Sequence, residues 1–205
     1  MKKLTSLLLI LALVLSLSCV AFATEDAAPA EEVEGTVYTC AFTIEELAGN
    51  TDMNGFVSAS PMTELNTIVL KDDGTYEYTK LLATLNEDGE VVEIETNEAT
   101  LRYEIRYVYT GTYTQEGDQV TLNVPEECEF SEDWGVLVEL GYMSNSEGKA
   151  SEGDRVVNYE GTDYDPMDNF GSQVYKFVGH DEPVSVTVNE DGTFTYNEVA
   201  SSDDD

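Results

Sequence analysis

Apolar and polar residues alternate with a period of two along several stretches of the chain. In the segment LRYEIRYVY, residues 101–109, one face carries Leu101, Tyr103, Ile105, Tyr107 and Tyr109. Arg102 and Arg106 fall on the opposite face. Because successive side chains of a strand point to opposite faces, this pattern predicts a half-buried β-strand with its tyrosines inward. Shorter alternations at Tyr76 and Tyr78, and in the ranges 92–94 and 120–124, predict further strands.

Acidic residues followed by glycine recur between these strand-like segments. Asp73-Gly74 separates TIVL from TYEYT, and similar pairs stand at Asp88-Gly89, at Asp191-Gly192 and in Glu116-Gly117-Asp118. Glycine tolerates positive φ, and aspartate accepts hydrogen bonds from the backbone of a turn. We therefore expect hairpin turns here. Calcium loops are disfavoured because the ligand spacing does not match.

One short helix is predicted near the N-terminus. Thr43 and Glu46 have the spacing of a capping box, and Gly49 provides a stop. The range 126–172 is rich in Glu, Asp, Gly and Ser, so we expect long loops there. Together these elements predict an all-β fold, an antiparallel up-and-down β-barrel, because closure removes exposed strand edges. A β-sandwich is the alternative.

Three segments resemble the lipocalin-like (calycin) domains of secreted bacterial proteins. They are Gly35-Thr36-Val37-Tyr38, the hairpin VLKDDGTYEY from Val69, and TGTYTQEGDQVTL from Thr110. The resemblance covers about residues 35–125. It implies a barrel that encloses a cavity for a small ligand.

The first 23 residues have the pattern of a secretory signal peptide. Two lysines precede an apolar run, and Ala21-Phe22-Ala23 forms a small-x-small cleavage site. Cys19 raises the alternative of a lipid-anchored protein, but Ser16 stands where such signals usually carry leucine. We therefore expect export with cleavage, a secreted protein, and no membrane insertion afterwards.

The remaining chain divides by composition. Residues 24–34 form an acidic linker and residues 200–205 an acidic tail, and both are expected to be disordered because they have little to bury. Residues 35–199 are then a single β domain, since this length supports one core.

The charge of the chain is strongly negative. Lys and Arg number 9 against 42 Asp and Glu, for a formal net charge of −33. Nucleic-acid binding requires clustered basic residues, so that class of function is excluded. The acidity keeps an exported protein soluble, or else it recruits cations or basic partners such as cell-wall amines.

Two cysteines, Cys40 and Cys128, lie outside the signal segment. Export permits a disulfide between them, whereas the alternative is a pair of reduced, buried thiols. Pairing depends on geometry that spacing alone does not define.

The tyrosines are the strongest candidates for ligand binding. The predicted inward face gathers five of them: Tyr76, Tyr78, Tyr103, Tyr107 and Tyr109. Tyrosine supplies apolar area together with a hydroxyl, so such a face lines a pocket in a barrel or forms core in a sandwich.

A metal site is a further candidate, in the segment DYDPMDN. Asp163, Asp165, Asp168 and Asn169 would converge on an ion such as Ca²⁺ if Pro166 turned the chain tightly. The alternative is a solvated acidic loop. Apart from this site, we expect no cofactor.

No catalytic motif is present in the sequence. His180 beside Asp181 is the single histidine, and nothing near it in the sequence supplies a nucleophile. Arg102 and Arg106 are expected to pair with carboxylates of neighbouring strands, such as Glu77, Glu93 and Glu95. We therefore expect a non-enzymatic module that binds a small apolar or amphipathic ligand or a cell-envelope partner. The alternative is a cell-surface interaction domain that engages divalent cations or basic partners.

Overall fold

The computed structural model of the chain describes residues 34–44, 62–86, 89–95, 100–139, 141, 144–158, 161–171 and 182–197. Short helical turns occur in these ranges at α2 (Val136–Glu139) and η2 (Pro166–Asn169). The strands are β1 (Thr36–Ile44), β2 (Met62–Leu70), β3 (Thr75–Ala83), β4 (Ile94–Glu95), β5 (Thr100–Leu101), β6 (Glu104–Glu116), β7 (Gln119–Leu122), β8 (Glu127–Asp133), β9 (Ser146–Ala150), β10 (Val156–Val157), β11 (Asp163–Tyr164), β12 (Val184–Val188) and β13 (Phe194–Tyr196). The predicted all-β fold is confirmed.

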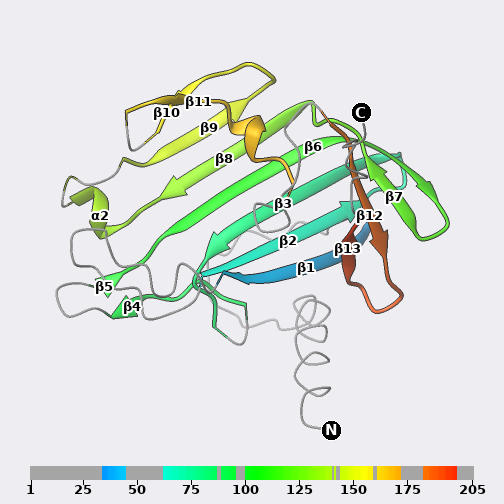
Figure 1. Cartoon of the computed structure of the whole chain (residues 1–205), viewed down its shortest axis with the longest axis horizontal. Coiled ribbons are helices and arrows are strands. Elements are labelled where there is room, and N and C mark those ends of the chain that lie inside the picture. The colour runs from blue at the N-terminus through cyan, green and yellow to red at the C-terminus, as the bar shows by residue number, and fades with distance from the viewer. Residues whose placement is uncertain are drawn as a thin grey trace, which may run out of the picture.

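Nine of the strands form one antiparallel sheet that curls into a nearly closed barrel (Figure 1). Its main path runs β1-β2-β3-β6-β7-β12-β13. The two ends of this path meet where the Thr39 amide donates to the carbonyl of Gly192 at 2.9 Å. Thr39 also forms a parallel bridge with Thr193. The barrel prediction is therefore confirmed, with a narrow seam between β1 and β13.

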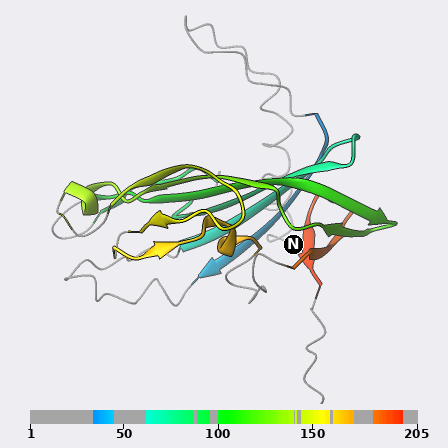
Figure 2. The same ribbon diagram turned by 90° about the horizontal axis from the view of Figure 1, so that it is seen from above.

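Strand β6 is the branch point of the sheet. One edge of β6 pairs with β3 from Glu104 to Thr112. The other edge is shared, because β8 pairs with its first half and β7 with its last four residues. The hairpin of β8 and β9 therefore extends the sheet outside the barrel, and we call this hairpin the wing. The strand order of the sheet is thus not a simple up-and-down meander. Figure 2 shows η2, β10 and β11 on one side of β3, β6 and β8. The strands β12 and β13 lie on the same side of β3, β6 and β8.

The acidic glycine turns are hairpin turns. Between β2 and β3, Asp73 Oδ1 accepts from the Thr75 amide at 3.0 Å and from its hydroxyl at 2.6 Å. Asp191 makes the same two contacts with Thr193, at 3.1 and 2.6 Å, between β12 and β13. Gly74 has a φ of 84°, where a side chain would be strained. These bonds to the turn lower the pKa of both aspartates.

The remaining two turns also reverse the chain. Gly117, with a φ of 66°, joins β6 to β7. Before Gly89, Asp88 lies outside the described residues. The amide of Asn86 donates to the carbonyl of Glu90 at 3.0 Å, which closes this fourth acidic turn.

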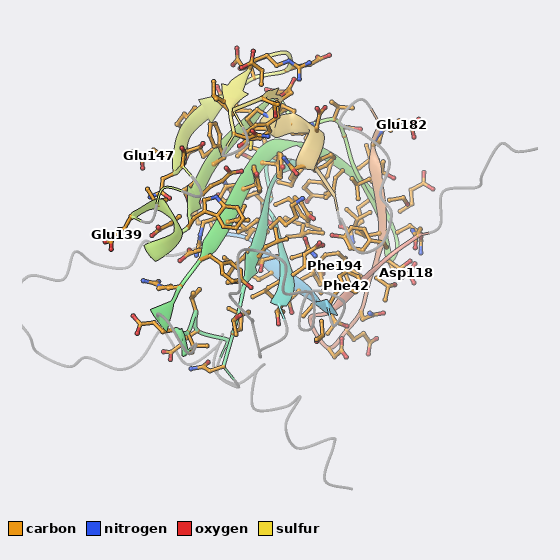
Figure 3. All side chains as sticks on the ribbon, turned by 60° about the vertical axis from the view of Figure 1, so that its left-hand side comes forward. Phe42, Asp118, Glu139, Glu147, Glu182 and Phe194 are labelled. Carbon is orange, nitrogen blue, oxygen red and sulfur yellow. The ribbon has the colours of Figure 1, made fainter. Side chains whose placement is uncertain are left out.

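The interior of the barrel is filled largely by aromatic side chains. Tyr76, Tyr78, Tyr107 and Tyr109 are all buried, as the alternation predicted. Phe170, which follows η2, enters between them, with its ring centre 5.2 Å from that of Tyr109 and 5.6 Å from that of Tyr78. In Figure 3, Phe42 and Phe194 lie close together where β1 meets β13, while Glu139, Glu147 and Glu182 lie on the outside.

A chain of polar groups crosses this core. Asn66 donates to the buried Glu64 carboxylate at 2.8 Å and accepts from the Tyr78 hydroxyl at 2.6 Å. The Tyr78 hydroxyl also lies 2.8 Å from that of Tyr196. Tyr78 and Tyr196 hold the same position in LKDDGTYEY and VNEDGTFTY, so the two matching hairpins meet in the core through equivalent residues.

One expectation was wrong, and another falls largely outside the described residues. Thr43, the predicted cap, pairs with Thr63 within β1; the range 45–50, which contains the rest of the predicted helix, lies outside the described residues. The range 126–172 is not mainly loop, because β8 and β9 extend the sheet within it. Strand β8 was missed because one of its inward positions is Glu132, which interrupts an apolar alternation that only Cys128 and Phe130 mark.

Replacing Tyr78 by phenylalanine should destabilise the protein. Asn66 and Tyr196 would keep buried polar atoms but lose a partner, which costs roughly 1 to 3 kcal/mol. Urea unfolding followed by circular dichroism measures the change. Tyr113→Phe is the matched control, because the Tyr113 hydroxyl donates to the carbonyl of Lys71 in a part-buried site. Equal stability of wild type and Tyr78→Phe would contradict the assigned network.

Candidate functional site

A pocket of about 360 Å³ lies where η2 and β11 meet the sheet. Strands β3, β6 and β8 provide its floor, and η2 and β11 provide a wall. We call it the Glu132 pocket. Its lining residues are Leu82, Ile105, Tyr107, Glu132, Trp134, Asn158, Tyr164, Asp168 and Asn169. The pocket therefore combines aliphatic, aromatic and carboxylate groups.

Glu132 is the buried acid of this pocket, with 7% of its surface exposed. It points inward because it follows Cys128 and Phe130 on the same face of β8. Its Oε1 atom accepts hydrogen bonds from the hydroxyl of Tyr107 at 2.5 Å and from that of Tyr164 at 2.9 Å. Burial and the negative charge of Glu132 both raise the pKa of the two tyrosines, so they stay neutral donors.

Aromatic rings form one side of the pocket. The rings of Trp134 and Tyr103 stack with centres 6.1 Å apart and planes at 28°. The turn after β8 holds Trp134 in place: its amide donates to Asn145 Oδ1 at 2.9 Å, and the next residue, Gly135, has a φ of 51°. A Cβ at Gly135 would lie 2.4 Å from the carbonyl oxygen of Arg102, so glycine is required there.

Lys80 is buried beside the pocket. Its Nζ donates to the carbonyl oxygen of Asn169 and lies 5.4 Å from the centre of the Tyr107 ring. Burial lowers its pKa to about 8, against the opposing effects of Glu64 and Cys128. Lys80 therefore ties η2 to the sheet. Sequence reasoning missed it, although it shares the inward face of Tyr76 and Tyr78 in TYEYTK.

The five predicted ligand-binding tyrosines separate into core and pocket. Tyr76, Tyr78, Tyr107 and Tyr109 all belong to the core cluster, and Tyr107 is the one of these four that also lines the pocket. The Tyr76 hydroxyl donates to the carbonyl of Asn123 at 2.8 Å, and that of Tyr109 donates to the carbonyl of Pro166 at 3.1 Å. Tyr107 lines the pocket, and Tyr103 borders it through its stack on Trp134.

The predicted metal ligands do not converge. Asp165 is 1% exposed and caps η2, where it accepts from the amide of Met167 at 3.0 Å and from that of Gly153 at 2.8 Å. Asp163 is exposed on β11, and Asp168 faces Arg155 at 3.9 Å. Within the described ranges, no group of three His, Cys, Asp or Glu residues is placed to hold a metal ion. In this structure the helical turn at Pro166 uses Asp165 as its cap, and a metal site in this segment stays a prediction.

Cys40 and Cys128 are free thiols. Strands β2, β3 and β6 lie between β1 and β8 in the sheet, so the predicted disulfide is not formed. Burial raises the pKa of Cys40 to about 11 and that of Cys128 to about 12. Cys128 is buried and Cys40 is partly buried, and a raised pKa leaves both as thiols at neutral pH.

The other charged candidates lie apart from the pocket. Arg102 and Arg106 both bind Glu104 of their own strand segment, at 3.4 and 2.9 Å, not the carboxylates of other strands that we expected. Their side chains are about half exposed. His180 lies outside the described residues.

Searches against protein-family models, curated proteins and solved structures found no match for this chain. In the described part of the chain, no helix has the length and apolar character needed to cross a membrane. The interpretation of the site therefore depends on its geometry. A buried carboxylate, tyrosine hydroxyls and stacked rings around a small hollow are suited to holding a small molecule with apolar and polar parts.

Lys80 should make stability depend on pH in a defined window. Its pKa is lower in the folded state, so the unfolded chain binds the proton more strongly between about pH 8 and 10.5. The unfolding free energy of wild type relative to Lys80→Met should therefore rise by about 2 kcal/mol from about pH 7.5 to about pH 9.5. Tyrosines and thiols with raised pKa oppose this trend, but they are common to both proteins and cancel in the difference.

Urea unfolding of both proteins at each pH gives this difference. Lys149→Met is the control, because it removes an exposed amine of β9 and should not reproduce the rise. A pH-independent difference between wild type and Lys80→Met would show that the Lys80 amine is not desolvated.

Proposed function

We propose that this protein is an exported, non-enzymatic β-barrel module that binds a small amphipathic ligand in the Glu132 pocket. The observation that carries the proposal is the pocket itself. It has about 360 Å³ of space, apolar side chains at Leu82 and Ile105, and polar groups from β8 and η2. Small-molecule sites typically have this size and this mixture of surfaces.

The rigidity of the pocket supports a binding role. Glu132 is held by two hydroxyls, Trp134 by a stack and a backbone bond, and η2 by the bond from Lys80 to Asn169. Preformed walls reduce the entropy that a ligand must overcome on binding. Export is part of the proposal because residues 1–23 have the pattern of a secretory signal.

The proposal keeps the ligand-binding role that the resemblance to lipocalin-like domains implies, but it does not place the ligand inside the barrel. A ligand in the middle of the barrel would need the space that Phe170 occupies among Tyr76, Tyr78 and Tyr109. The Glu132 pocket lies beside this filled interior, over the part of the sheet where Ile105 of β6 pairs with Glu132 of β8. We therefore place the ligand between this part of the sheet and η2.

Native mass spectrometry of the protein purified from its own host tests this function. We expect an adduct of small mass on wild type that is lost in Trp134→Ala, because that change removes one wall of the pocket. Tyr113→Phe is the control, because the Tyr113 hydroxyl donates to the carbonyl of Lys71 and neither residue lines the pocket. This variant should retain the adduct. Repeated preparations without adduct, or an adduct that persists in Trp134→Ala, would reject the proposal.

A role at the cell surface is a second candidate, favoured by the net charge of −33. An acidic exterior of this kind attracts divalent cations and basic partners. A cation that binds only the folded state must raise the unfolding temperature. Thermal unfolding with and without millimolar calcium therefore tests this role, and an unchanged midpoint would reject its cation version.

A further inference from the structure

We propose that the ligand of the Glu132 pocket carries a protonated amine on an apolar body, and that Glu132 is its counter-charge. This inference depends on the proposed function, because it assigns the chemical class of the molecule that occupies the same pocket.

The first argument is the environment of the Glu132 carboxylate. A buried carboxylate is costly unless hydrogen bonds and an opposite charge compensate for the water it has lost. Glu132 receives two hydrogen bonds, but both donors are neutral hydroxyls and both bonds fall on Oε1. Among the described residues, the ion pairs involve Glu104, Glu129 and Asp168, not Glu132. The site therefore supplies an acceptor and a negative charge, and a cation would complete it.

The second argument is that the cations described near the pocket are directed elsewhere. The amine of Lys80 donates to the Asn169 carbonyl and lies over the Tyr107 ring. Arg155 lies 3.9 Å from Asp168, the other carboxylate of the pocket. A ligand ammonium would therefore not compete with a built-in partner for Glu132.

The third argument is the surface around the carboxylate. Tyr107, Tyr164 and Trp134 line the same pocket, and aromatic faces attract ammonium groups. Leu82 and Ile105 provide apolar area for the body of the ligand. The tyrosine hydroxyls already donate to Glu132, so they hold the carboxylate in position without neutralising it.

The fourth argument is the charge of the whole molecule. A net charge of −33 concentrates cations near the surface and repels anions. Carboxylate and phosphate ligands are thereby disfavoured at a pocket that already contains Glu132 and Asp168. A neutral polyhydroxyl ligand would gain nothing from this field, so it becomes an outcome of the test.

Trp134 provides the means of measurement, because it is the single tryptophan of the chain and lines the pocket. We would titrate the full protein with n-hexylamine, 1-hexanol and hexanoate, which share one apolar chain and differ in head group and charge. Saturable changes in Trp134 emission should appear with hexylamine at lower concentration than with hexanol, and hexanoate should be weakest.

Glu132→Gln keeps an acceptor for both tyrosine hydroxyls and removes only the charge. It should weaken hexylamine binding about tenfold or more and bring it to the level of hexanol. Glu127→Gln is the matched control, because it removes the same charge from the exposed face of the same strand. It should leave hexylamine affinity unchanged.

The outcomes separate the two proposals. If hexanol binds wild type as tightly as hexylamine, or if Glu127→Gln weakens hexylamine as much as Glu132→Gln does, the amine assignment is wrong although the pocket still binds. If none of the three probes changes the emission of Trp134 while native mass spectrometry shows an adduct, the amine assignment also fails and the proposed function stands. The wild-type comparison of hexylamine with hexanol decides the matter even if Glu132→Gln does not fold.

Discussion

Each inward-facing tyrosine of the barrel brings a hydroxyl into the interior, and a buried hydroxyl needs a hydrogen-bond partner. This requirement ties distant segments to the sheet. The Tyr76 hydroxyl binds the backbone after β7, that of Tyr78 meets β13, and that of Tyr109 meets the start of η2. The aromatic core therefore gains its specificity from the positions of a few polar atoms as well as from apolar area.

Tyr107 follows the same rule but with a different partner, and this difference produces the pocket. Its hydroxyl binds the carboxylate of Glu132 rather than a carbonyl or another tyrosine. Glu132 belongs to β8, which occupies the edge of β6 that β7 leaves open. Ile105 of β6 pairs with Glu132, near the end of β8, and η2 and β11 lie over this part of the sheet. The pairing of β8 with β6 therefore positions Glu132 beside Tyr107.

Buried ionisable groups occur in this region as well as at Glu64 in the core. Lys80 and Glu132 face the same interior as the tyrosines, although each charge is costly there. Lys80 is compensated by a backbone carbonyl and a ring, and its lowered pKa shows the remaining cost. Glu132 accepts hydrogen bonds from two tyrosine hydroxyls and has no ion-pair partner among the described residues.

The local pattern of the sequence was sufficient for the strands and their turns. Alternation placed Tyr76, Tyr78, Tyr107 and Tyr109 inward, and Asp73 and Asp191 marked hairpins, because strand periodicity and turn chemistry depend on neighbouring residues alone. The same pattern did not predict β8, because the inward-facing Glu132 interrupts the apolar alternation of that strand.

Only the tertiary structure decided which partners those residues meet. The distance between Cys40 and Cys128, the use of Asp165 as a cap, and the approach of Phe170 to Tyr109 all depend on how the sheet branches and closes. Branching at β6 assigns its first half to β8 and its last four residues to β7, and the alternation along a single strand does not specify its partner. The sequence by itself determined which way the tyrosines of β3 and β6 face, because that depends on strand periodicity, and the pairing and closure of the sheet determined what lies opposite them.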